Sequence, residues 1–184
     1  METNLRKIGA VDIGVNLDED TLKYQHIIEQ DLALNKGTNL LYMDVGAMET
    51  KLIVYANGKK VSSQSFKIGD MKLLSETVSI RDMEIYKDWL DNITELYSPS
   101  VIIASGERID IISDILGSKE SGKIDYFSIK ELYEKMQNLT IKERMDLYNI
   151  EKHHSKVILA TLYLYLIAFQ RCKILGFYSK KQFS

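Results

Sequence analysis

The 184-residue chain has little cysteine or proline, no excess of one charge and no long apolar run. A single cysteine, Cys172, excludes an internal disulfide and a zinc cage built on cysteines, and it suits a reducing compartment. One proline and ten glycines exclude collagen-like and Pro/Gly-rich disordered chains. A formal net charge of −2 speaks against a dedicated nucleic-acid binder, which usually carries a basic face.

Export and membrane signals are also lacking. The first nine residues are polar and charged and contain no apolar signal-peptide core. The longest apolar run, Val157–Phe169, would span about 20 Å as a helix, which is short of the ~30 Å hydrocarbon layer. We therefore expect a cytoplasmic protein with neither a membrane nor a nucleic acid as its partner.

What is present is an alternation of strand-like and helix-like segments. The polar pattern of residues 60–67 is typical of an edge strand, and Asn57-Gly58 before it predicts a hairpin turn. Capping-box patterns begin at Ser128 and at Thr140. The predicted strands are Ile8–Val15, Thr38–Ala47, Thr50–Ala56, Lys60–Lys67, Val101–Ala104, Ile124–Phe127 and Ile174–Tyr178. The predicted helices are Glu19–Ala33, Arg81–Tyr97, Glu107–Leu116, Ser128–Leu139, Lys142–Leu147 and His153–Cys172.

The order of these elements predicts the fold class. From residue 38 onward, three strands joined as an antiparallel meander are followed by helix–strand crossovers. This is the layout of an α/β ribonuclease-H-like domain, as in half of an actin-like ATPase. Its meander is extended by parallel strands, and its helices cover both faces of the sheet.

The first candidate site is the turn that follows the strand ending near Asp44. A carboxylate there would hold Mg²⁺ or a water molecule, and Gly46 would let a phosphate approach the backbone N–H groups of the turn. The competing interpretation is a plain strand turn with a surface aspartate.

The second candidate site is Ser105-Gly106, where a buried strand ends and a helix begins. Ligands of open α/β sheets bind at such strand ends, and helix N-termini favour anions. Glu107 in the first helical turn would repel an anion, so an ordinary strand-to-helix turn is the competing interpretation.

His153 and His154 are expected to be solvated or capping residues. Adjacent residues on a helix do not share a face, which makes the pair a poor metal clamp, and the sequence indicates no third ligand. Cys172 has no activating neighbour in the sequence and is expected to be a core or edge thiol.

Taken in order, these motifs resemble the second domain of the exopolyphosphatase / guanosine pentaphosphate phosphohydrolase (Ppx/GppA) family, within the actin-like ATPase superfamily. The family carries Asp-Ile-Gly-Gly-Gly-Ser-Thr-Glu, then a hairpin and Leu-Gly-x-x-Arg-Leu, then Gly-Thr-Gly-Gly-Thr after an apolar strand. The matching segments here are Leu41–Lys51, Asn57-Gly58, Ile68–Leu73 and Ala104–Arg108, and later Leu139–Arg144 and His154–Thr161. The resemblance implies the ribonuclease-H-like fold, a phosphate site at Gly46, Ser105 and Gly106, and Asp44 as a catalytic residue that holds metal or water.

The departures from the family pattern weaken this implied site. Of the three glycines in the first phosphate turn only Gly46 remains, and a methionine side chain, Met48, would occupy phosphate space. Glu49 stands at the serine position and Lys51 at the glutamate position, so Asp44 is the only acidic group kept.

The resemblance also implies a division of the chain. Residues 1–37 would be a strand and crossover helix left from a first domain, and residues 38–184 the second domain. In the family the first domain carries the other phosphate loop and the catalytic glutamate, and the resemblance implies that the rest of this domain is missing here. An unpaired strand at Ile8–Val15 would add to its own sheet or pair between two copies.

We therefore expect a degenerate Ppx/GppA-like domain, a pseudoenzyme that acts by binding or by forming a homo-oligomer, or by joining a partner that supplies the missing half. The alternative is an active Mg²⁺-dependent hydrolase of polyphosphate or guanosine polyphosphate (pppGpp), working as part of a longer chain or complex. A third interpretation is an unrelated α/β domain of the same architecture.

Overall fold

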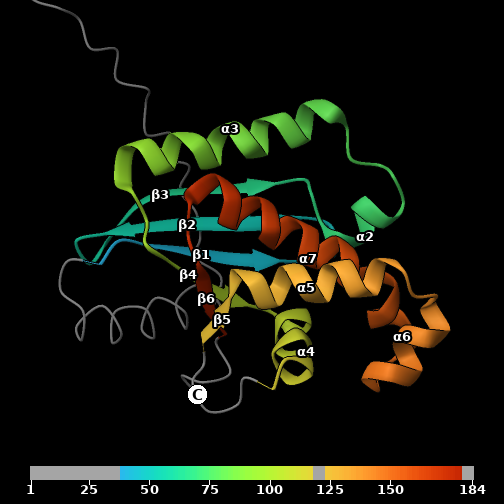
Figure 1. Ribbon diagram of the computed structural model, residues 1–184. Coiled ribbons are helices and arrows are strands. Elements are labelled where there is room, and N and C mark those ends of the chain that lie inside the picture. Colours follow the sequence, from blue (N-terminus) through green and yellow to red (C-terminus); the bar gives the residue numbers. More distant parts are fainter. Residues whose placement is uncertain (1–37, 118–122, 180–184) are drawn as a thin grey trace, which may run out of the picture.

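The computed structural model describes residues 38–117 and 123–179, and these form one mixed sheet with helices packed against it (Figure 1). The predicted strand Ile8–Val15 and helix Glu19–Ala33, and with them the proposed remnant of a first domain, lie outside the described residues. Among the described helices, none is long and apolar enough to span a bilayer.

The strands follow the predicted order closely. The six-stranded sheet has the order β3-β2-β1-β4-β6-β5. Antiparallel pairing joins β1 to β2 and β2 to β3, while β1 pairs with β4 and β4 with β6 in parallel. The strands are β1 (Leu40–Val45), β2 (Thr50–Ala56), β3 (Lys59–Phe66), β4 (Val101–Ser105), β5 (Lys123–Asp125) and β6 (Gly176–Ser179). The meander extended by parallel strands is confirmed, and β3 lies at the sheet edge as its polar pattern predicts.

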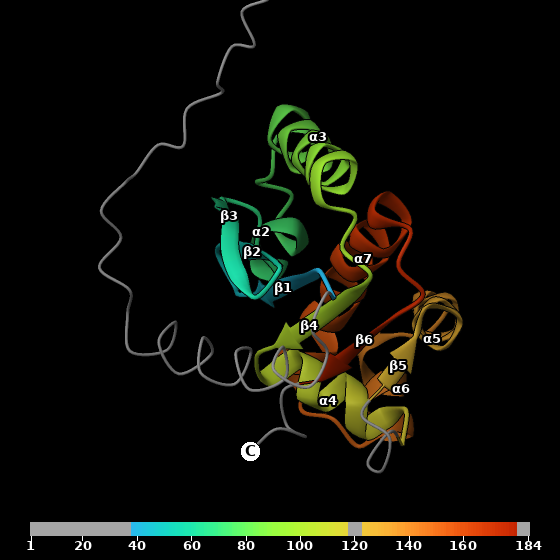
Figure 2. The ribbon, with the colours of Figure 1, turned by 90° about the vertical axis from the view of Figure 1, so that its left-hand side faces the viewer.

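Six described helices connect and cover these strands. They are α2 (Asp70–Leu74), α3 (Ile80–Tyr97), α4 (Glu107–Ile115), α5 (Tyr126–Gln137), α6 (Ile141–Tyr148) and α7 (Lys152–Cys172). The long helix α7 packs against α2, α3, α5 and α6, and the turned view shows it beside the sheet (Figure 2). All five predicted helices after residue 38 match within two residues at each end.

Helix α5 starts earlier than predicted. Its N-cap is Asp125, whose side chain accepts a hydrogen bond from the Ser128 N–H, so Ser128 lies inside the helix and does not cap it. The capping box at Thr140, in contrast, is present at the start of α6. The extended segment predicted through Phe127 is therefore wrong beyond Asp125.

Alternate positions of the strands divide the core into two clusters. Leu41 and Met43 of β1 point into the larger cluster, to which helices α3, α4, α5 and α7 also contribute buried side chains. Leu40 and Tyr42 belong to a second cluster on the opposite face. Among the described residues, only strand side chains and no helix contribute to this second cluster.

Candidate functional site

The parallel pairing of β1 and β4 brings the two predicted bends together. Asp44 and Ser105 are paired in the register of these strands, and Gly106 follows at φ +107° as the N-cap of α4. A Cβ added at Gly106 would lie 3.1 Å from Asp44 Oδ1. The carboxylate of Asp44 thus lies close to the Gly106 backbone, at the carboxyl ends of two parallel strands, where ligands of open α/β sheets bind.

Gly46 lies in the turn between β1 and β2, and the chain itself uses the polar backbone groups of this turn. The Gly46 N–H donates to the Glu49 carbonyl at 2.9 Å. The carbonyls of Gly46 and Ala47 accept the N–H groups of Asp70 (3.0 Å) and Met71 (3.2 Å) at the start of α2. An anion bound here would have to compete with these hydrogen bonds.

Two further side chains differ from their implied roles. The Ser105 hydroxyl lies 2.5 Å from the Tyr42 hydroxyl, and both residues are buried. Met48, expected to occupy phosphate space, is 60% exposed. The described structure therefore offers neither a solvent-facing Ser105 hydroxyl nor a Met48 side chain packed into the turn.

Close to the two bends, a largely buried ion pair links helix α4 to helix α2. Arg108 Nε lies 2.5 Å from Asp70 Oδ2, and Asp70 is fully buried. The Thr161 hydroxyl on α7 also donates to Asp70 Oδ2, at 3.2 Å. Burial raises the pKa of Asp70, although Arg108 and Thr161 both act to lower it. The guanidinium that could have faced a phosphate is thus committed in part to a buried carboxylate.

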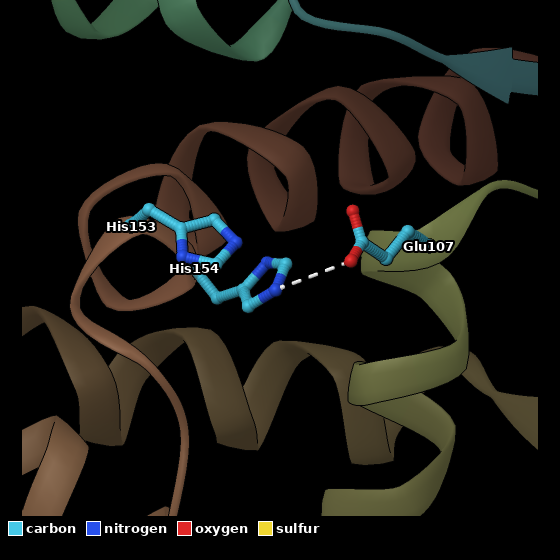
Figure 3. Close-up of side chains that lie close together, drawn as sticks. All are labelled: Glu107, His153 and His154. Atoms are coloured by element: carbon cyan, nitrogen blue, oxygen red, sulfur yellow. Dashed lines mark ion pairs between the residues drawn. The ribbon is translucent and has the colours of Figure 1, made fainter.

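Next to Gly106, three side chains from two helices gather in a way that the sequence did not predict (Figure 3). His154 Nε2 lies 3.5 Å from Glu107 Oε1, and the ring centroids of His153 and His154 are 3.6 Å apart. The expectation of two solvated or capping histidines is wrong for His154, which is buried, and Glu107 is the third potential ligand that sequence reasoning missed. The pKa of His154 is lowered mainly by burial and secondly by the neighbouring His153, and this favours the neutral imidazole.

Formal charges around the two bends do not favour an anion. Asp44, Asp70 and Glu107 are acidic, while the bases are Arg108 and Lys51, the latter lying opposite Asp44 across the β1–β2 pair. Sites that bind phosphate chains need an excess of positive charge from side chains, metal or helix N-termini.

The fit to magnesium is poor. Mg²⁺ takes oxygen ligands in octahedral geometry. Within the part of the chain that the structure describes, the only group of three potential metal ligands is Glu107, His153 and His154, and Asp44 does not belong to it. A magnesium ion at Asp44 would draw its other ligands from water and phosphate. The Glu–His–His group instead suits metals that bond to imidazole nitrogen.

A hollow of about 1020 Å³ lies elsewhere, at the opposite ends of the strands. Its lining includes Val101 at the start of β4, Gly176 at the start of β6 and Cys172. Burial raises the pKa of Cys172 to about 11, which leaves it a protonated, unreactive thiol at neutral pH, as the sequence predicted. This hollow holds none of the predicted site residues.

Fold and site together define a ribonuclease-H-like α/β domain whose candidate site lies where β1 and β4 end. No protein-family profile and no curated protein matches the sequence. Solved structures do. The type II variant of the Aquifex aeolicus Ppx/GppA phosphatase is 16% identical with a TM-score of 0.65, covering 83% of this chain and 56% of its own.

Two further structures agree. An exopolyphosphatase from Cytophaga hutchinsonii is 12% identical with a TM-score of 0.64, over 86% of this chain and 59% of its own. An exopolyphosphatase-like protein is 13% identical with a TM-score of 0.59, over 79% of this chain and 56% of its own. The chain therefore has the fold of Ppx/GppA phosphatase structures, and it spans somewhat more than half their length.

Proposed function

We propose that this chain is a degenerate Ppx/GppA-like domain, which acts in the cytoplasm by binding or by oligomerisation and does not turn over phosphates on its own. The observation that carries the proposal is the use of the polar groups at the two bends. The Gly46 N–H is bonded within its own turn, and Arg108 is paired with the buried Asp70.

The chemistry of phosphoryl transfer explains why the use of these polar groups matters for activity. The transferred group spreads negative charge over three oxygens, and catalysis depends on donors and metal ions that neutralise it. At these bends the acidic side chains outnumber the basic ones, and Lys51 stands at the position where the family has its glutamate. The arrangement supports retention of the fold with loss of the chemistry.

The proposed binding role follows from a retained fold in which the chain itself already uses polar groups at the two bends. The similar phosphatase structures are longer, and this chain corresponds to 56–59% of each of those compared. In our proposal the chain binds a second copy of itself or a partner chain, and polyphosphate or a guanosine polyphosphate is at most a bound ligand.

An active Mg²⁺-dependent hydrolase of polyphosphate or pppGpp is the second candidate. The observation in its favour is the placement of the Asp44 carboxylate against Gly106, at the carboxyl ends of β1 and β4. In that case activity would require the rest of a longer chain or a complex.

Phosphate release distinguishes the two. The purified chain is incubated with Mg²⁺ and either polyphosphate or pppGpp, alongside Asp44→Ala and the matched control Asp88→Ala, which changes an exposed aspartate on α3. We expect no release above the blank from any of the three proteins. Release that Asp44→Ala abolishes and Asp88→Ala preserves would overturn the proposal in favour of the hydrolase.

A further inference from the structure

The side chains of Glu107, His153 and His154 meet beside the Gly106 bend, although His153 comes 46 positions after Glu107 in the sequence (Figure 3). Glu107 is the first residue of α4, and the two histidines are in the first turn of α7. One potential ligand atom from each residue lies within 4.8 Å of the others. We propose that these three residues form a binding site for a divalent first-row transition metal ion of the zinc type.

The donor set identifies the class of metal. Two imidazole nitrogens and one carboxylate oxygen are ligands that Zn²⁺ takes, with a fourth position left for water or another ligand. Helices α4 and α7 both begin at the cluster, and helix N-termini carry a partial positive charge. This charge disfavours any cation that binds only through electrostatic attraction and forms no strong bonds to its ligands. The site should therefore select metals that bond strongly to imidazole over Mg²⁺.

His154 provides an independent indication. The residue is only 5% exposed, and its Nδ1 is buried with no hydrogen-bond partner among the described residues. Buried polar atoms in native proteins are nearly always satisfied, so an unpartnered ring nitrogen in a ligand cluster calls for a group that the chain does not supply. A coordinated metal ion is such a group.

His153 has the support that metal-bound histidines usually have. Its Nδ1 lies 3.3 Å from Oε2 of Glu151, the N-cap residue of α7. Ligating histidines commonly direct the nitrogen that is not coordinated to a carboxylate, which fixes the ring orientation. This contact leaves Nε2 of His153 as its metal-binding atom.

Only a small closure is needed to complete the site. Tetrahedral zinc with bonds of about 2.0–2.1 Å sets its ligand atoms about 3.4 Å apart. The side chains of Glu107 and His153 are 66% and 59% exposed, so both are able to rotate, while the buried His154 stays in place. The proposal does not depend on phosphatase activity, since it concerns side chains that neither proposed function uses.

Calorimetric titration of the untagged full chain with Zn²⁺, after removal of metals with a chelator, tests the site. We expect one Zn²⁺ per chain, not displaced by about a 100-fold excess of Mg²⁺. Co²⁺ in place of Zn²⁺ should give the visible absorption bands of a four-coordinate ion with nitrogen and oxygen ligands.

Variants of the exposed ligands keep the test decisive, because neither should unfold the protein. Glu107→Gln and His153→Gln should each weaken Zn²⁺ binding by at least about tenfold, and His154→Gln by more. His26→Gln removes the third histidine of the chain and should leave binding unchanged. The proposal would be overturned if the native chain did not bind Zn²⁺. It would also be overturned if Glu107→Gln and His153→Gln bound Zn²⁺ as tightly as the native chain, or if His26→Gln lost as much affinity as they do.

Discussion

Among the described glycines, Gly69 leaves the least space for a side chain. A Cβ at this position would lie 2.2 Å from the Ala47 carbonyl oxygen, because the turn between β1 and β2 packs directly on the start of α2. Gly69→Ala should lower the free energy of unfolding by at least about 2 kcal/mol, since backbone must move on one side or the other. Urea denaturation followed by circular dichroism measures this.

Gly58→Ala is the matched control for that substitution. Gly58 has φ +73° and no atom within 4 Å of an added Cβ. The substitution should therefore lower the free energy of unfolding only through the left-handed backbone conformation, by about 1–2 kcal/mol. A Gly69→Ala protein as stable as the native chain would contradict the close approach of the two backbones.

Asp70 makes a prediction about pH. Burial raises its pKa above the ordinary value of 3.8, so its contribution to stability is full below that value and is lost as the pH rises through the folded-state pKa. Asp70→Asn cannot ionise and keeps the shape of the side chain. Its stability relative to the native chain should therefore increase as the pH rises from 3.8 through the folded-state pKa of Asp70.

Denaturant unfolding of both proteins at several pH values measures this trend. The exposed Asp88 on α3 offers the control, because Asp88→Asn should show no such change. A relative stability of Asp70→Asn that falls with rising pH would mean that Arg108 outweighs burial at this site.

At the residue scale, the sequence predicted the meeting of Asp44 and Gly106 but not that of Glu107 with the histidines. The first follows from topology, because parallel neighbours end at the same edge of a sheet. The second depends on the packing of α4 against α7 and on ring rotation in a first helical turn. Spacing along one helix contains neither piece of information.

At the scale of elements, Arg144 ties three helices together. From α6 its Nε donates to the Met136 carbonyl at 2.9 Å on α5, and its Nη1 to the Ser155 carbonyl at 3.1 Å on α7. The Ser155 hydroxyl returns a hydrogen bond to the Ile141 carbonyl at 2.9 Å. The buried guanidinium thus satisfies carbonyls near the ends of two neighbouring helices.

Arg144→Met should therefore destabilise the protein by about 2–4 kcal/mol, because two buried carbonyls lose charged donors. Thermal unfolding measures the loss, with Arg81→Met on the exposed face of α3 as the control that should remain near the native value. Equal stability of the two variants would refute the role of Arg144 as a tie between helices.

One helix, α2, and the start of another, α5, were not predicted, for a shared reason. Helix α2 has only five residues, and its first N–H groups bond to the carbonyls of the β1–β2 turn. The start of α5 at Tyr126 follows from the Asp125 cap, together with the Tyr126 N–H bond to the Leu175 carbonyl. Both boundaries are set by partners distant in sequence, whereas α3 and α7 are long enough for their apolar pattern to reveal them.

At the scale of the whole molecule, we expect the chain to self-associate. The second hydrophobic cluster receives no helix side chains from the described residues, and Ile8–Val15 is predicted from its sequence to be a strand that pairs with its own sheet or with a second copy. Size-exclusion chromatography with light scattering should give a mass above that of one chain. A monomer in which the amides of Ile8–Val15 exchange freely with solvent would refute the pairing of this segment.

The strand order of the whole sheet was predictable only in part. A polar edge strand and a buried central strand can be recognised from composition, and β3 and β4 occupy those places. Nothing local indicates that β6, the last described strand, lies between β4 and β5. That insertion depends on the return path of α7 across the domain.

The parallel pairing of β1 with β4 has a kinetic consequence. More than fifty residues, comprising β2, β3, α2 and α3, lie between these two strands. The hairpin and α3 can form from neighbouring residues, but Asp44 and Gly106 become adjacent only after that long loop has closed. A ligand that contacts both bends therefore does not bind early folding intermediates. It stabilises only chains in which β1 has already paired with β4.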